Sequence, residues 1–144
     1  MSLETPTIHF FSDGVRFTLK QKNLVRQWLH VCAKREKRII GELSFIFTSD
    51  NKLKTINKHF LDHNYFTDVI TFPTIEKRGE INGEIYISID RVKDNAKTYG
   101  VRMYEELHRV IVHGMLHLCG HGDGTEAEKS RMKKLENKYL QLLP

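Results

Sequence analysis

The segment HGMLHLCGHGD, residues 113–123, holds the most informative pattern in this 144-residue chain. Its first part belongs to a predicted helix over about 103–119. Within that helix, His113 and His117 stand four residues apart and therefore lie on one face, where two imidazoles can bind one metal ion. Gly120 then ends the helix and lets the chain turn back, so that Asp123 can supply a third ligand.

The ligand spacing matches that of the zinc site in metzincin peptidases: two histidines one turn apart, a glycine, and a third ligand beyond it. That third ligand is a histidine there, but a carboxylate oxygen binds zinc at a similar distance, about 2.0–2.2 Å, so Asp123 can take its place. Three protein ligands leave a position for water, as in a catalytic zinc site. His121 competes with Asp123 for the third place, and Asp123 is favoured because Gly120 should end the helix before His121 can stack above His117.

The residue after the first histidine argues against a peptidase. In HExxH peptidases a glutamate stands there and acts as the general base, whereas this chain has Gly114. A metal hydrolase of another kind therefore remains the better interpretation. Cys119, next to the histidines, is expected to be a small buried apolar residue rather than a ligand, and His108 is expected to pack near the start of the helix.

The rest of the chain predicts one α+β domain over residues 1–144. Strands are expected at Thr7–Phe11, Ile39–Thr48, Asp68–Thr74 and Glu84–Ile89. Helices are expected at about 20–36, from Asp50, at Asp90–Tyr99, at about 103–119 and after Thr125. Because strands and helices do not alternate strictly, we expect a small mixed sheet of about four strands packed with about five helices, with the zinc site at the end of a helix.

Local signals place three of the boundaries. Asn82-Gly83 is expected to be a turn before the last strand. Gly100 is expected to follow a helix C-terminus. Thr125 and Glu128 are expected to form a capping box.

Composition narrows the class of partner. Lys and Arg outnumber Asp and Glu by 23 to 18, a net charge of +5 that favours an anionic partner such as nucleic acid. No apolar run approaches the length of a membrane span, and no secretory signal is visible, so neither a membrane nor an export route is expected. Cys32 and Cys119 form no disulfide framework, which favours the cytoplasm. No nucleotide cofactor is expected.

Residues 113–123 resemble the HGxLHLxGYDH signature of the YbeY family, bacterial endoribonucleases of ribosomal RNA maturation. Asn57 and the segments 67–73 and 83–88 also resemble its central segments, and the resemblance covers residues 40–143 well and the N-terminal part loosely. It implies a single-strand-specific endoribonuclease with one zinc per chain, held by His113, His117 and Asp123. It further implies action at the 3′ end of small-subunit ribosomal RNA and in ribosome quality control, with the small ribosomal subunit as partner.

The chain departs from the family pattern at two places. Asp123 replaces the third zinc histidine, and the Tyr-Asp pair before that ligand becomes His121-Gly122. The family also has an arginine, thought to contact RNA, at the position of Leu61. Arg102 and Arg109 could substitute for this arginine. An equally good interpretation is that both belong to a solvated helix face. The general base is unassigned, with Glu84 as a candidate.

A second function stays open: a non-catalytic, zinc-stabilised ribosome-assembly factor that only binds RNA, which the missing arginine favours. Basic residues at 34–38 could contact RNA or simply stabilise the end of a helix. Four residues could offer stacking surfaces for unpaired bases, or could be ordinary loop and core residues: His59, His63, Tyr65 and Phe66.

Overall fold

One mixed four-stranded sheet organises the protein, in the strand order β1-β2-β4-β3. The computed structural model describes residues 7–61 and 67–144. β1 and β2 are parallel, as are β2 and β4, whereas β3 runs antiparallel to β4 at the edge. The elements in chain order are β1 (Ile8–Ser12), α1 (Lys22–Arg35), β2 (Ile39–Thr48), α2 (Asp50–Leu61), β3 (Val69–Pro73), β4 (Glu80–Ser88), α3 (Ile89–Tyr99), α4 (Met103–Leu118) and α5 (Glu126–Leu140). The predicted α+β fold is confirmed.

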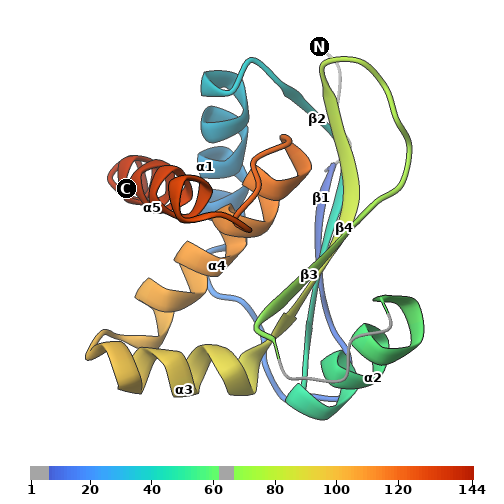
Figure 1. Cartoon of the computed structure of the whole chain (residues 1–144), viewed down its shortest axis with the longest axis vertical. Helices are drawn as coiled ribbons and strands as arrows, with labels where there is room; N and C mark the ends of the chain where they lie inside the picture. The colour runs from blue at the N-terminus through green and yellow to red at the C-terminus, as the bar shows by residue number, and fades with distance from the viewer. Residues whose placement is uncertain (1–6, 62–66) are drawn as a thin grey trace.

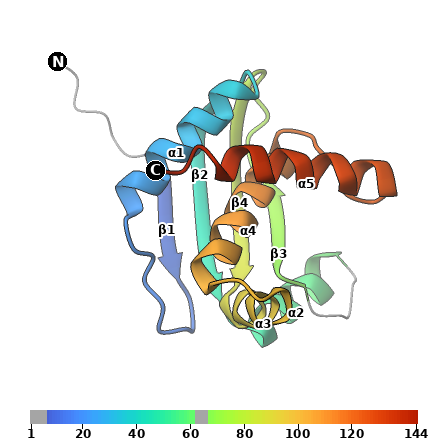
Figure 2. The same cartoon turned by 90° about the vertical axis from the view of Figure 1, so that its left-hand side faces the viewer.

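The helices are distributed unequally over the two faces of the sheet. α1, α4 and α5 lie on one face, while α2 lies toward the lower end of the other (Figures 1 and 2). Period-two alternation sends Phe45 and Phe47 of β2, and Ile85 and Ile87 of β4, toward the helix-covered face, where all four are buried. Trp28 of α1 completes this core and donates from Nε1 to the carbonyl oxygen of Tyr139 in α5, at 2.7 Å.

Two of the three local boundary predictions are confirmed. Thr125 and Glu128 form the reciprocal capping box of α5, and Gly100 ends α3 in the left-handed conformation with φ of 69°. The predicted turn at Asn82-Gly83 is wrong, because both residues lie inside β4. The Asn82 side chain accepts from the backbone N–H of Glu42 on β2, at 2.8 Å, so this asparagine bridges strands instead of turning the chain.

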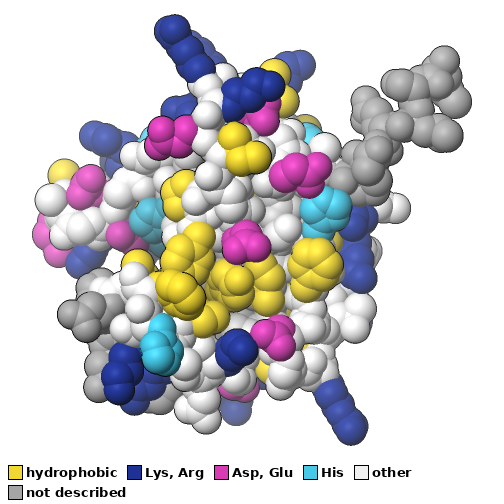
Figure 3. All heavy atoms as spheres, turned by 90° about the vertical axis from the view of Figure 1, so that its right-hand side faces the viewer, with side chains coloured by type: hydrophobic (Ala, Val, Ile, Leu, Met, Phe, Trp, Pro, Cys, Tyr) yellow, Lys and Arg dark blue, Asp and Glu magenta, His cyan; other side chains and the backbone are white. Residues whose placement is uncertain are grey.

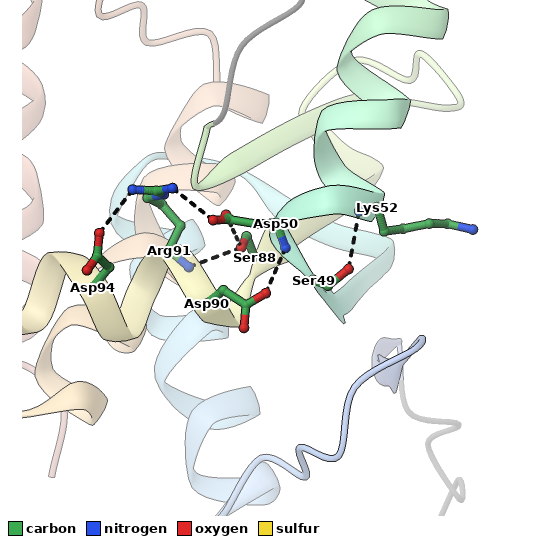
Figure 4. Close-up of polar contacts among 7 residues, drawn as sticks. All are labelled: Ser49, Asp50, Lys52, Ser88, Asp90, Arg91 and Asp94. Carbon is green, nitrogen blue, oxygen red and sulfur yellow. Dashed lines mark hydrogen bonds and ion pairs between the residues drawn. The ribbon is translucent and has the colours of Figure 1, made fainter.

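The N-termini of α2 and α3 meet and share their capping groups (Figure 4). Ser88 accepts from the backbone N–H of Arg91 and donates from its hydroxyl to Asp50, at 2.7 Å. Asp50 also pairs with the guanidinium of Arg91, at 2.8 Å, and its backbone N–H donates to Asp90. This network fixes α2, and with it the wall of the cavity described below, against the end of β4. Of the described helices, none combines the length and apolarity that a bilayer crossing demands.

Candidate metal centre

Three potential ligand atoms converge at the end of α4. The Nε2 atoms of His113 and His117 lie 3.0 Å apart, and Oδ2 of Asp123 lies 3.4 Å from the first and 3.3 Å from the second. A tetrahedral ion with bonds of about 2.0–2.1 Å holds its ligand atoms about 3.3–3.4 Å apart. The observed triangle is close to that size, so this group could hold a metal ion.

The end of α4 explains how the third ligand reaches the histidines. Gly120 adopts φ of 99°, a left-handed conformation that favours glycine, and so reverses the chain. The reversal is anchored on both sides: the N–H of His121 donates to the carbonyl oxygen of Leu116, and Arg38 donates to that of Cys119, both at 3.1 Å. The loop thus presents Asp123 beside the histidines.

A buried carboxylate from α5 holds the first histidine in place. Oε2 of Glu136 lies 2.6 Å from Nδ1 of His113, and Glu136 is only 6% exposed. Its other oxygen accepts from Arg109, at 2.9 Å, and Arg109 also reaches Asn137. Burial lowers the pKa of His113, but the hydrogen bond and charge of Glu136 outweigh it and raise the pKa overall. Such a carboxylate on the outer imidazole nitrogen fixes the ring orientation of metal-binding histidines.

The competing ligand His121 points elsewhere. Its Nε2 lies 2.6 Å from Oε1 of Glu36, at the end of α1, and the hydroxyl of Tyr139 donates to the other oxygen of Glu36. Burial would raise the pKa of Glu36, but these two hydrogen bonds outweigh it and lower the pKa. The structure therefore brings Asp123, and not His121, into the group.

Two cavities meet at the candidate ligands. One of about 850 Å³ lies between α4 and α5, and the other, of about 370 Å³, lies between α4, β3 and the end of α2. Both are lined by Asp68, His113 and Asp123. Burial raises the pKa of Asp68, and burial together with the charge of Asp68 raises the pKa of Glu106 to about 7. The group thus lies where the two cavities adjoin, among buried and partly buried carboxyl groups.

The remaining predicted site residues are scattered. Glu84 lies on the opposite face of the sheet from α4, because Ile85, its neighbour, is the residue that contacts Gly114, so the structure does not support Glu84 as the general base. Arg109 is engaged with Glu136, and Arg102 is exposed before the first residue of α4. Leu61, where the family has arginine, lines the smaller cavity.

The other residues considered have plain structural surroundings. His108 packs edge-on against Trp28 and Tyr104. Burial raises the pKa of the Cys119 thiol to about 12, and this residue is only 7% exposed. His59 is exposed on α2. His63, Tyr65 and Phe66 lie outside the described residues.

Sequence reasoning missed Glu136 and Asp68. Glu136 stands four residues after Met132 and three before Tyr139, so it occupies the buried face of α5. An acidic residue in an apolar stripe was the signal that could have identified it. Asp68 stands directly before the first residue of β3, and no spacing in the sequence connects it to the histidines.

The ligand set, the cleft and the fold together define a small α+β protein with a site of the type that metal hydrolases use. The chain belongs to the YbeY family: a family model described as endoribonuclease YbeY matches residues 8–144. The predicted membership is confirmed, and the match includes the N-terminal part.

Curated relatives and one solved structure agree with this assignment. The endoribonuclease YbeY of Cytophaga hutchinsonii is 47% identical over 140 residues, which cover 97% of this chain and 98% of that protein. The endoribonuclease YbeY of Amoebophilus asiaticus is 42% identical over 92% of this chain and 90% of that protein. The solution structure of TM1509 from Thermotoga maritima matches with a TM-score of 0.64 at 28% identity, covering 93% of this chain and 87% of that one.

Proposed function

We propose that this chain is a zinc-dependent endoribonuclease that cleaves single-stranded RNA during maturation of the 3′ end of small-subunit ribosomal RNA and in ribosome quality control. The observation that most directly supports a metal-dependent activity is the triangle of ligand atoms where the two cavities adjoin. The relatives named endoribonuclease YbeY support the reaction class. The proposal places the protein in the cytoplasm, with the small ribosomal subunit as its partner.

In this proposal His113, His117 and Asp123 hold one zinc ion, and their nitrogen and oxygen donors suit that metal. When bound, the ion supplies Lewis acidity and makes water more acidic. Glu136 keeps Nε2 of His113 directed at the ion through its contact with Nδ1. Asp123 brings a negative charge where the family has a neutral histidine, which lowers the net charge of the site.

Two lysines at the larger cavity offer contacts for an RNA strand. The two cavities share Asp68, His113 and Asp123, so in this proposal a strand lies along both of them, past the ligand group. Lys129 and Lys133, one turn apart on α5, line the larger cavity and can neutralise phosphates. Sequence-specific RNA recognition commonly uses unpaired bases.

A non-catalytic RNA-binding factor is the second candidate, and one observation favours it. Leu61 lines the smaller cavity beside His113 and His117, so the cavity lacks the positive charge that the family places at this position. Restoring it by Leu61→Arg should raise cleavage if the chain is a nuclease with a weakened phosphate contact. Metal content should not change.

The deciding experiment measures cleavage and binding together. Zinc-reconstituted protein is compared with His117→Ala on single-stranded and duplex RNA, with cleavage followed on gels and binding by fluorescence anisotropy at several salt concentrations. A nuclease cleaves only with His117 present, and each phosphate contact should contribute about −0.7 to the slope of log affinity against log salt. Salt-dependent binding without cleavage, in the original chain and in Leu61→Arg, would establish the binding factor instead.

A further inference from the structure

Two basic segments lie side by side at one end of the molecule. Segment 34–38 includes the end of α1 and the connection to β2, and segment 76–80 includes the end of the connection between β3 and β4. The backbone N–H of Ile39 donates to the carbonyl oxygen of Gly79, at 2.9 Å, which makes the two segments neighbours. Besides three glutamates they contain six basic residues, here called the basic end: Lys34, Arg35, Lys37, Arg38, Lys77 and Arg78.

Positive charge is in excess on the surface of the basic end. Glu80 pairs with Lys77, at 3.5 Å, and the side chain of Glu36 is only 13% exposed and contacts His121. In the part of the chain that the structure describes, four members are exposed and pair with no carboxylate: Lys34, Arg35, Lys37 and Arg78. Figure 3 shows Lys and Arg side chains gathered at this end, the top of the view. The basic end can therefore attract a polyanion.

The basic end adjoins the candidate metal centre through segment 118–122, which connects the second candidate ligand to the third. Arg38 donates to the carbonyl oxygen of Cys119 in this segment, at 3.1 Å. Oε1 of Glu36, in the same turn as Arg38, lies 2.6 Å from Nε2 of His121. A strand that leaves the cleft across this segment therefore meets the basic end.

Stabilisation of a helix end accounts for only part of this charge. Lys34 and Arg35 lie in the last turn of α1, where cations interact favourably with the helix dipole. Lys37 lies beyond that turn and Arg78 is on no helix, so a dipole effect confined to the last turn explains neither. Lys37 also has φ of 60°, a left-handed conformation that suits glycine better than lysine. Binding of an anion would account for both cations.

We propose that the basic end binds the phosphates of an RNA strand on one side of the candidate metal centre, an inference that rests on the proposed function. The strand lies across segment 118–122, between the cleft and the basic end. Contacts to phosphates hold a nucleic acid in place without reading its sequence. RNA is favoured over an acidic protein segment because the basic end adjoins the cleft in which, by the proposed function, RNA is cut.

The salt dependence of binding gives the size of the expected effect. Each phosphate contact of a single strand contributes about −0.7 to the slope of log affinity against log salt. The double variant Lys34→Gln, Lys37→Gln should therefore have a slope less steep by about 1.4. Its affinity at about 0.1 M salt should fall about 25-fold if the affinity at about 1 M salt is unchanged.

The matched control is the double variant Lys93→Gln, Lys97→Gln. It removes the same charge from two exposed lysines of α3, which lies at the opposite end of the molecule (Figure 1). Neither lysine lines either of the two cavities at the candidate ligands. This control should bind RNA within about threefold of the unaltered chain, because exposed charges more than a Debye length away, about 10 Å at 0.1 M salt, are largely screened.

Binding is measured by fluorescence anisotropy with the metal-free full chain, so that the RNA is not cut, and circular dichroism checks that each variant is folded. Two single-stranded oligonucleotides are used, of about four and about 16 nucleotides, the range of site sizes in single-strand-binding domains. The Lys34→Gln, Lys37→Gln variant should lose affinity for the longer RNA and bind the shorter one, which fills only the cleft, within twofold of the unaltered chain. If this variant does not fold, Arg78→Gln should weaken binding of the longer RNA about fivefold.

Three results would overturn the proposal: an equal loss in the two double variants, an equal loss for the two RNA lengths, and a polyglutamate peptide that binds the basic end as tightly as the longer RNA. The last would assign the surface to an acidic protein segment. Cleavage of both RNAs by the zinc-loaded chain is measured separately. If the proposed function fails, the unaltered chain cuts neither RNA, whereas failure of the present inference leaves that cleavage intact.

Discussion

Replacing Glu136 by Ala should weaken zinc binding although Glu136 is not in the ligand group. The change removes the acceptor that holds Nδ1 of His113, at 2.6 Å, and one of the two acceptors of Arg109. His113 can then rotate and Nε2 loses its fixed direction. Removing a partner of this kind lowers metal affinity about 10- to 100-fold, or about 1.4–2.8 kcal/mol. A lost hydrogen bond to a charged group, about 1.5–3 kcal/mol, leads to the same range.

The measurement is a competition titration against a chromophoric zinc chelator, with the folded state of each metal-free protein checked by circular dichroism. Asn137→Ala is the matched control, because it removes the other contact of Arg109 and leaves Glu136 on His113. Glu136→Gln should fall between the two, since an amide oxygen still accepts but carries no charge. The reasoning is refuted if folded Glu136→Ala binds zinc within twofold of the unaltered chain, or if Asn137→Ala loses as much affinity.

The other ligand and packing assignments lead to further measurable outcomes. Asp123→Ala should lower zinc affinity in isothermal titration far more than His121→Ala, and the reverse order would show that the third ligand is misassigned. Gly114→Ala should destabilise the protein by about 1–3 kcal/mol, because the new Cβ would lie 2.7 Å from Ile85; an unchanged urea midpoint would contradict this close approach. With its pKa raised to about 12, the thiol of Cys119 should be alkylated about tenfold faster for each unit of pH above 8, and rapid alkylation at pH 8 would mean that it is not buried in solution.

The order and type of the elements followed from the sequence because their signals are local. The capping box of Thr125 and Glu128 needs only residues three apart, and the structure forms it as predicted. The histidine pair needs only one helical turn. The turn predicted at Asn82-Gly83 was wrong because an Asn-Gly pair can also lie inside a strand, where the glycine allows a neighbouring strand to approach closely. A Cβ at position 83 would lie 2.8 Å from the carbonyl oxygen of Phe72, so close strand packing accounts for this glycine.

The surroundings of the metal centre depend on contacts between distant segments, and these were not predictable from spacing. Glu136 reaches His113 only because α5 packs across α4, and Glu36 reaches His121 across 85 positions of sequence. A carboxylate in an apolar helix stripe indicates a buried partner, but it does not identify that partner. Likewise, the location of Glu84 could be predicted only with the sheet register, which places its side chain on the face opposite α4, away from the candidate metal centre.

Gly114 connects the packing of the fold to the class of chemistry. Its missing side chain already argued against a peptidase, and the structure gives a stronger reason. Successive residues of an α-helix are rotated by about 100°, and position 114 is turned toward β4, where it contacts Ile85. A glutamate placed there would meet the sheet before it could reach the ligand atoms of His113 and His117. The helix that presents the two histidines to the cleft therefore excludes a glutamate base from that position.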